Sequence, residues 1–107
     1  MAYTLLPGHA SKVIDAIASG ATGTAKSKIF ALQTGSYNAI QFQAVGGDLQ
    51  ANLTSSQDGG TTFDVVQAYD FTTQRTQITN LVPGVLYRWD VTANATHPTD
   101  LLASQGK

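Results

Sequence analysis

The chain of 107 residues contains no cysteine and no glutamate, one tryptophan and few charged side chains of either sign. The lack of cysteine excludes a disulfide framework and any thiolate metal site. Long surface helices usually carry Glu and Lys pairs, so the lack of glutamate argues against a helical bundle. No apolar run is long enough to cross a membrane, and the amino-terminal residues lack the charged and apolar regions of a signal peptide.

The formal net charge of −1 gives no reason to expect affinity for polyanions, so neither nucleic acid nor a membrane is an expected partner. An uncharged polar surface suits a protein that meets its partner over a broad neutral face. The length corresponds to one domain. We expect a single β-sandwich domain over residues 11–107, preceded by an amino-terminal arm over residues 1–10.

The stretch Tyr37–Val66 has the strongest pattern, with three short runs in which apolar and polar residues alternate. The apolar sets are Ile40, Phe42 and Ala44, then Leu49, Ala51 and Leu53, then Phe63 and Val65. Alternation with period two places each set on one face of a half-buried strand. Gly46-Gly47 and Asp58-Gly59-Gly60 supply the positive φ angles that tight hairpins need. We therefore predict two successive hairpins, a meander, as the core.

The flanking segments give further strands. Ser11–Gly20 fits either a helix or a strand, and its β-branched residues favour a strand. Lys28–Thr34 carries apolar residues on both parities and is expected to be a central or sandwiched strand. Gln67–Gln74 is predicted to cross between sheets. Arg75–Asn80 is predicted to be a short strand with Ile78 directed inward.

Val85–Ala93 shows the cleanest alternation in the chain, with Trp89 on the apolar face. We expect Trp89 to be the largest single contributor to the core. Thr99–Ser104 is a candidate last edge strand. Seven or eight short strands, with turn signals about every ten residues, predict an all-β, antiparallel two-sheet sandwich.

No pattern of catalytic or metal-binding residues is found in the sequence. His9 and His97 are far apart and each lies beside a breaker, so they do not predict a zinc site. Asp58 is interpreted as a turn residue that bonds its own backbone rather than a calcium ligand. Nothing places Asp64 and Asp90 together as a carboxylate pair. We expect no catalytic residue, no metal and no cofactor.

The amino-terminal segment Met1–Gly8 is apolar and uncharged and ends in Pro7-Gly8. Tyr3, Leu5 and Leu6 either tuck under the domain or dock on a partner, and they are the candidate partner-binding residues. Arms of this length are poorly ordered unless something holds them.

The span Lys28–Ala93 resembles small β-sandwich proteins of tailed bacteriophage particles. These proteins commonly carry a hairpin of serine, any residue, aspartate-glycine, any residue, threonine and an aromatic residue. Here the hairpin is Ser56–Phe63, with the turn Asp58-Gly59-Gly60 and with Phe63 where tryptophan is common. The resemblance implies a protein that sits on the capsid as a decoration protein or head fibre, or on the tail.

The span Thr76–Ala93 also looks like the end of a fibronectin type III domain. The matching positions are Leu81, Pro83, Gly84 and Tyr87. In that fold the tyrosine forms a corner, with its hydroxyl bonded to the backbone a few residues upstream. The early tryptophan strand of that family is missing here. This resemblance implies an immunoglobulin-like sandwich rather than membership of the family.

Together these resemblances lead us to expect a non-enzymatic virion protein, made in the host cytoplasm and located on the bacteriophage head surface. The expected role is capsid decoration, with the shell of major capsid protein as partner and self-association into a trimer or another homo-oligomer as a second contact. The alternative is an immunoglobulin- or fibronectin-like adhesion or carbohydrate-binding module.

Overall fold

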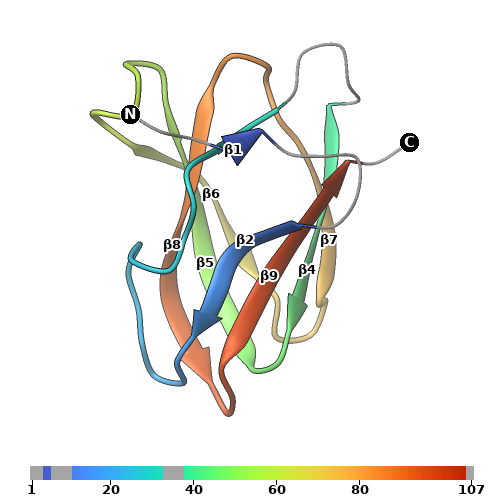
Figure 1. Ribbon diagram of the computed structural model, residues 1–107. Coiled ribbons are helices and arrows are strands. Elements are labelled where there is room, and N and C mark those ends of the chain that lie inside the picture. Colours follow the sequence, from blue (N-terminus) through green and yellow to red (C-terminus); the bar gives the residue numbers. More distant parts are fainter. Residues whose placement is uncertain (1–3, 6–10, 33–37, 106–107) are drawn as a thin grey trace.

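The computed structural model describes residues 4–5, 11–32 and 38–105, and all regular elements in these residues are β-strands. The strands form two sheets that pack face to face (Figure 1). Sheet A contains, in spatial order, β1 (Thr4–Leu5), β3 (Phe30–Ala31), β8 (Leu86–Ala95), β5 (Asp48–Ser56) and β6 (Asp64–Asp70). Sheet B contains β2 (Ser11–Ile17), β9 (Thr99–Gln105), β4 (Ala39–Val45) and β7 (Thr76–Asn80). The predicted all-β two-sheet sandwich is confirmed.

The order of the strands is that of a jelly roll. Four antiparallel pairs, β2 with β9, β3 with β8, β4 with β7 and β5 with β6, form one long folded ribbon. Rolling this ribbon brings β4 beside β9 and β5 beside β8. Eight strands in two sheets with this connectivity define the jelly roll. In the immunoglobulin order the first two strands share a sheet, whereas β2 and β3 lie in opposite sheets here, so the sandwich is not immunoglobulin-like in its strand order.

Trp89 lies at the centre of the core between the two sheets. Its ring makes edge contacts with Phe42, Tyr69 and Phe71 at centroid distances of 5.0, 5.5 and 5.8 Å. The largest fully buried side chains are Trp89, Phe30, Phe42, Phe71, Ile14, Ile17, Leu32, Ile40, Leu49, Leu53 and Leu81. The alternating apolar sets of β4, β5 and β8 supply much of this core, as their periodicity predicts.

The predicted meander is wrong at its first hairpin. β4 and β5 lie in different sheets, so Gly46-Gly47 forms a corner between sheets rather than a hairpin turn. The apolar faces of β4 and β5 are buried against each other across the sandwich, and alternation alone does not distinguish this from pairing side by side. The second predicted hairpin, β5 to β6, is confirmed.

The glycines at this corner allow a close approach of backbone. A Cβ on Gly46, at φ +118°, would lie 2.1 Å from the carbonyl oxygen of Pro98. A Cβ on Gly47 would lie 2.2 Å from the carbonyl oxygen of His97. The β4–β5 corner therefore packs directly on the β8–β9 turn.

Two predictions about the edge strands are wrong. Ile78 was expected inward, but its side chain on β7 is 68% exposed. Val65 was expected on a buried face, but it is 61% exposed on β6, and the whole of β6 is largely exposed. Both strands are sheet edges, so each has one strand neighbour and is little covered. The strand β6 also continues to Asp70, and the crossing between sheets follows it at residues 71–75 rather than spanning Gln67–Gln74.

The strand alternative for Ser11–Gly20 is confirmed by β2, although Val13, Ile14 and Ile17 are all buried. Two register shifts against β9 break the strict alternation. Of the predicted strand Lys28–Thr34, the structure describes residues 28–32, and in these the strand is reduced to the two residues of β3. Those residues are buried between β1 and β8, which agrees with the sandwiched position expected.

The segment 23–28 closes one side of the sandwich by bonding to both sheets. Gly23 exchanges backbone hydrogen bonds with Val91 of β8, and the amide of Trp89 donates to the Ser27 hydroxyl. The amide of Lys28 donates to the carbonyl of Val13 in β2. On the opposite side, β6 and β7 form the two sheet edges, and the Thr79 hydroxyl donates to the Tyr69 hydroxyl between them at 2.6 Å.

Candidate functional site

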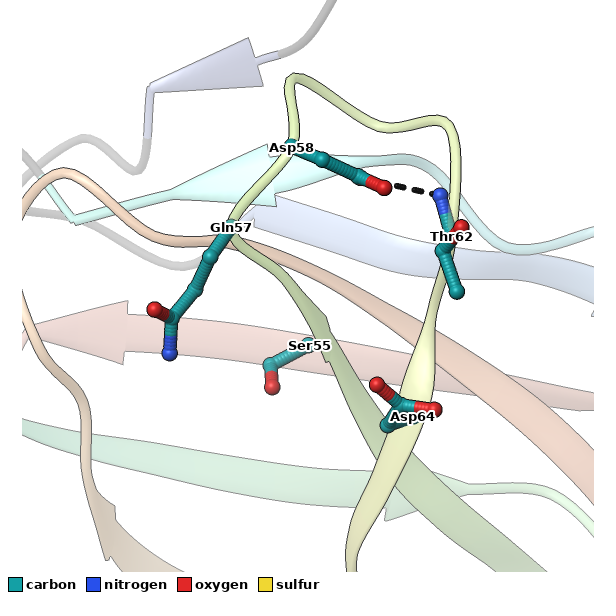
Figure 2. A pocket seen from close by; sticks show the side chains of 5 residues that line it. All are labelled: Ser55, Gln57, Asp58, Thr62 and Asp64. Carbon is teal, nitrogen blue, oxygen red and sulfur yellow. Dashed lines mark hydrogen bonds between the residues drawn. The ribbon is translucent and has the colours of Figure 1, made fainter.

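The β5–β6 hairpin is built around the carboxylate of Asp58. Its Oδ1 accepts hydrogen bonds from the amides of Thr61 and Thr62, at 3.1 and 2.9 Å, and from the Ser56 hydroxyl at 2.7 Å. Figure 2 shows the Asp58–Thr62 bond closing the loop. The buried Ser56 hydroxyl in turn accepts from the amide of Gly60. The interpretation of Asp58 as a turn residue that bonds its own backbone is confirmed.

These donors favour the charged carboxylate. The hydrogen bond from the Thr62 amide, followed by that from Ser56, lowers the pKa of Asp58 from 3.8 to about 2. Gly59 and Gly60 have φ angles of 77° and 95°, which supply the left-handed conformation that the turn requires. The Asp-Gly-Gly signature is thus explained by local structure.

This turn predicts a specific pH dependence of stability. Because the folded pKa of Asp58 is depressed, the carboxylate stabilises the fold fully above pH 4 to 5, and this contribution is lost as pH falls toward 2. We expect Asp58→Ala to lower the denaturation midpoint at neutral pH and the difference from wild type to shrink at pH 2. Denaturant titrations at both pH values measure this. Asp64→Ala is the control, and an Asp58→Ala difference of the same size at both pH values would contradict the prediction.

A shallow open pocket of about 430 Å³ lies beside this turn (Figure 2). It is lined by Ser55, Gln57, Asp58, Thr62 and Asp64. Oδ1 of Asp58 is already engaged by the turn. Phe63, which lies between Thr62 and Asp64 in the sequence, has the guanidinium of Arg88 4.1 Å above its ring. The pocket offers hydroxyl, amide and carboxylate groups to a polar ligand.

The other chemistry-bearing residues are not brought together. Asp64 on β6 is paired with Ser55, and Asp90 on β8 is paired with Asn52, on opposite sides of β5. Two strand spacings therefore separate the carboxylates by roughly 10 Å or more. Over the residues that the structure describes, His, Cys, Asp and Glu form no group of three that would hold a metal ion. His97 is exposed in the β8–β9 turn, and His9 lies outside the described residues.

No helix in residues 4–5, 11–32 and 38–105 is long and apolar enough to cross a membrane.

Tyr87 makes the corner contact that the fibronectin resemblance implies. Its hydroxyl accepts a hydrogen bond from the amide of Val82 at 2.9 Å, and its ring stacks on Phe30. Pro83 and Gly84 form the exposed turn between Val82 and Tyr87, with Gly84 at φ 87°. The corner fixes the turn that leads from β7 into β8, although the strand order is not that of fibronectin.

Tyr87→Phe is expected to lower the free energy of unfolding by about 1–3 kcal/mol, because it leaves the Val82 amide without its acceptor. Denaturant titration at neutral pH measures the loss. Tyr69→Phe is the matched control and should cost less, because its hydroxyl accepts from the rotatable side-chain hydroxyl of Thr79 rather than from a backbone amide. A loss below about 0.3 kcal/mol for Tyr87→Phe would show that the corner does not stabilise the fold.

Asn94 is a structural residue that the sequence analysis missed. Its side chain is 4% exposed, and Nδ2 donates to the carbonyls of Ile17 and Ala18 while Oδ1 accepts from the Thr99 hydroxyl. Thr99 also accepts from the amide of Gly47. This network joins the end of β2, the β8–β9 turn and the β4–β5 corner. In the sequence, Asn94-Ala95-Thr96 shows only a glycosylation pattern, and the buried amide is unavailable for that modification.

The candidate partner-binding residues of the arm are described only in part. Thr4–Leu5 pairs in parallel with Phe30–Ala31, so the backbone of Leu5 belongs to sheet A. Tyr3 and Leu6 lie outside the described residues. At Leu5, therefore, the backbone of the arm is paired with the protein's own sheet A.

The outer face of sheet B is uncharged over β4 and β7. Cross-strand pairs place Gln41 between Ile78 and Ser104, and Gln43 between Thr76 and Leu102. The charges at its β2 side are Lys12, Asp15 and Asp100, and Lys12 forms ion pairs with both carboxylates, at 3.6 and 3.5 Å.

Sheet A carries more charge on its outer face. There the register aligns Arg88, Asp90 and Asp70 with the polar residues of β5. The β4–β7 part of sheet B is therefore uncharged, whereas sheet A carries charged side chains on β6 and on β8.

Comparison of the chain with protein-family models, with curated proteins and with solved structures gives no match.

Proposed function

We propose that this protein is a non-enzymatic bacteriophage virion protein that decorates the capsid and binds the shell of major capsid protein. The observation that carries the proposal is the uncharged outer face of β4 and β7 in sheet B. Interface centres are depleted of charged residues, and Gln43 lies at the middle of a face that presents amides, hydroxyls and a few apolar groups. The phage-like hairpin Ser56–Phe63 and the jelly-roll order, which recurs in viral capsid domains, support the same role.

A shell of identical subunits requires only modest affinity from each copy. Contacts repeated over the lattice add avidity when copies also touch one another. A sheet face suits this role because its backbone is already ordered by strand pairing before it binds. The proposal therefore places the protein on the head surface, with the sheet B face toward the shell.

Co-sedimentation with undecorated capsids tests the proposal. Gln43→Arg places a long charge at the centre of the sheet B face, and we expect it to weaken attachment by at least about tenfold. Asn52→Arg, on the outer face of sheet A, is the matched control and should bind as wild type does. If the control weakens binding and Gln43→Arg does not, sheet A is the contact face.

Deletion of residues 2–7 tests the arm in the same assay. The structure predicts that this deletion also removes β1 from sheet A, so folding of the variant is checked by circular dichroism first. If the folded deletion loses binding while Gln43→Arg keeps it, the arm residues Tyr3, Leu5 and Leu6 form the anchor. If wild type ignores capsids, the decoration proposal fails.

The polar pocket favours a second candidate function, a carbohydrate-binding or adhesion module. Its hydroxyl, amide and carboxylate groups are the types that bind sugar hydroxyls, and jelly rolls include lectins. Glycan-array binding that is lost in Gln57→Ala, together with unchanged behaviour toward capsids, would favour this function over decoration.

A further inference from the structure

The strand β7 is an edge that lacks the usual protection against pairing with another chain. Its sequence, Thr-Gln-Ile-Thr-Asn over Thr76–Asn80, contains no charge and no proline. Its register against β4 runs without a shift. Ile78 at its centre is the most exposed of the large apolar residues in the described part of the chain. Natural sheet edges usually avoid this combination by charges, prolines, bulges or very short strands.

The other sheet edges carry those protective features. β6 has Asp64 and Asp70 at its ends and a register shift against β5. β2 has Lys12, two register shifts and a residue of positive φ, Ala16. The remaining edge of sheet A is β1, which is two residues long. The contrast within one molecule singles out β7.

The backbone groups on the free edge of β7 follow from its pairing with β4. The amide of Leu81 donates to the carbonyl of Asn38, and the amide of Ala44 donates to the carbonyl of Arg75. Hydrogen-bonded pairs alternate along an antiparallel ladder, so Gln77 and Thr79 bond to β4. Their neighbours Thr76, Ile78 and Asn80 direct their amides and carbonyls to the open edge.

We propose that β7 pairs with β7 of a second copy of this chain, antiparallel and about a two-fold axis at Ile78. This register places Ile78 opposite Ile78 and Thr76 opposite Asn80, so each polar residue faces another polar residue and no charges meet. About six backbone hydrogen bonds form across the axis, two at Ile78 and two at each flanking pair. The two four-stranded B sheets then join into one continuous sheet.

A second copy fits this edge because the edge is complementary to itself. The same antiparallel arrangement at β6, centred on its middle residue Gln67, would bring Asp64 opposite Asp70. A net charge of −1 per chain adds little repulsion between copies. The inference does not rest on the proposed capsid role, and it is tested on the purified protein alone.

Sedimentation velocity tests whether copies associate through β7. Wild type should shift from monomer to dimer as its concentration rises, and Ile78→Lys should weaken dimerisation by at least about tenfold because it places two like charges together at the axis. Val65→Lys, at a similarly exposed valine on β6, is the matched control and should leave the dimer unchanged. Wild type that stays monomeric up to millimolar concentration overturns the proposal, as does a dimer broken by Val65→Lys but not by Ile78→Lys.

Cysteine crosslinking tests the register, and the chain has no cysteine of its own to interfere. Ile78→Cys should form a disulfide-linked dimer on mild oxidation, because opposed residues lie within disulfide reach at about 5.5 Å between Cα atoms. Thr76→Cys alone should not crosslink, since its two copies lie roughly 13 Å apart, but it should crosslink when mixed with Asn80→Cys. Thr76→Cys that links to itself as efficiently as to Asn80→Cys overturns the register.

Discussion

Trp89→Ala is expected to lower the free energy of unfolding by about 3–5 kcal/mol, because it removes the ring on which three other aromatic side chains pack. The indole is fully buried between the sheets, and its loss leaves a cavity that rigid strands cannot fill. Equilibrium denaturation in urea measures the effect.

Trp89→Phe is the matched variant for this prediction. The indole Nε1 is buried and has no hydrogen-bond partner among the described residues, so the phenyl ring removes an unsatisfied donor along with some volume. Its cost should therefore be clearly smaller than that of alanine. If Trp89→Ala loses less than about 1 kcal/mol, Trp89 is not the centre of the core.

Gly46→Ala is the second substitution with a large expected effect. Its Cβ would overlap the carbonyl oxygen of Pro98, and the residue would also have to keep φ +118°. Backbone atoms at this corner cannot move aside without separating it from the β8–β9 turn. We expect a loss of about 3 kcal/mol or more in the free energy of unfolding.

Substitutions at two other glycines distinguish the steric cost of an added Cβ from the cost of holding alanine in a left-handed conformation. Gly59, at φ +77°, has nothing within 4 Å of an added Cβ, so Gly59→Ala should cost only about 1–2 kcal/mol for the left-handed conformation. Gly47 lacks a positive φ but would place its Cβ against the carbonyls of His97 and Ala95. Gly47→Ala should therefore resemble Gly46→Ala. Equal losses of unfolding free energy for Gly46→Ala and Gly59→Ala would contradict the close packing of the β4–β5 corner against the β8–β9 turn.

The parts of the fold that could be predicted from the sequence are those set by local pattern. The alternation through Tyr87, Trp89 and Val91 specifies the buried face of β8 without reference to any partner. The turn at Asp58 is likewise local, since all its hydrogen bonds join residues within four positions.

The choice of strand neighbours could not be predicted in this way. The face of β4 is fixed by Ile40, Phe42 and Ala44, yet its partners β9 and β7 lie far along the chain. A short loop between two strands usually forms a hairpin within one sheet. At Gly46-Gly47 the chain instead crosses to the other sheet, and the corner packs tightly against the β8–β9 turn. The jelly-roll order therefore emerges only from the full set of pairings.

Edge strands are exceptions to the rule that the apolar residues of a strand are buried. The side chains of Ile78 and Val65 are exposed because β7 and β6 are the edge strands of their sheets. Asn94 is the opposite case, a polar residue that is buried because backbone carbonyls at the end of β2 and in the β8–β9 turn accept hydrogen bonds from its side chain. The exposure of the edge residues and the burial of Asn94 both depend on neighbours that are distant in sequence. The exposed Ile78 supports the proposed pairing of β7 with a second copy of the chain.

Quantitative mass spectrometry of purified, gradient-banded phage particles tests the proposed role most directly. A protein that decorates the shell should be present in a copy number comparable to that of the major capsid protein, and tailless heads should retain it. Absence from the particles, or a few copies that are lost with the tail, would contradict the account.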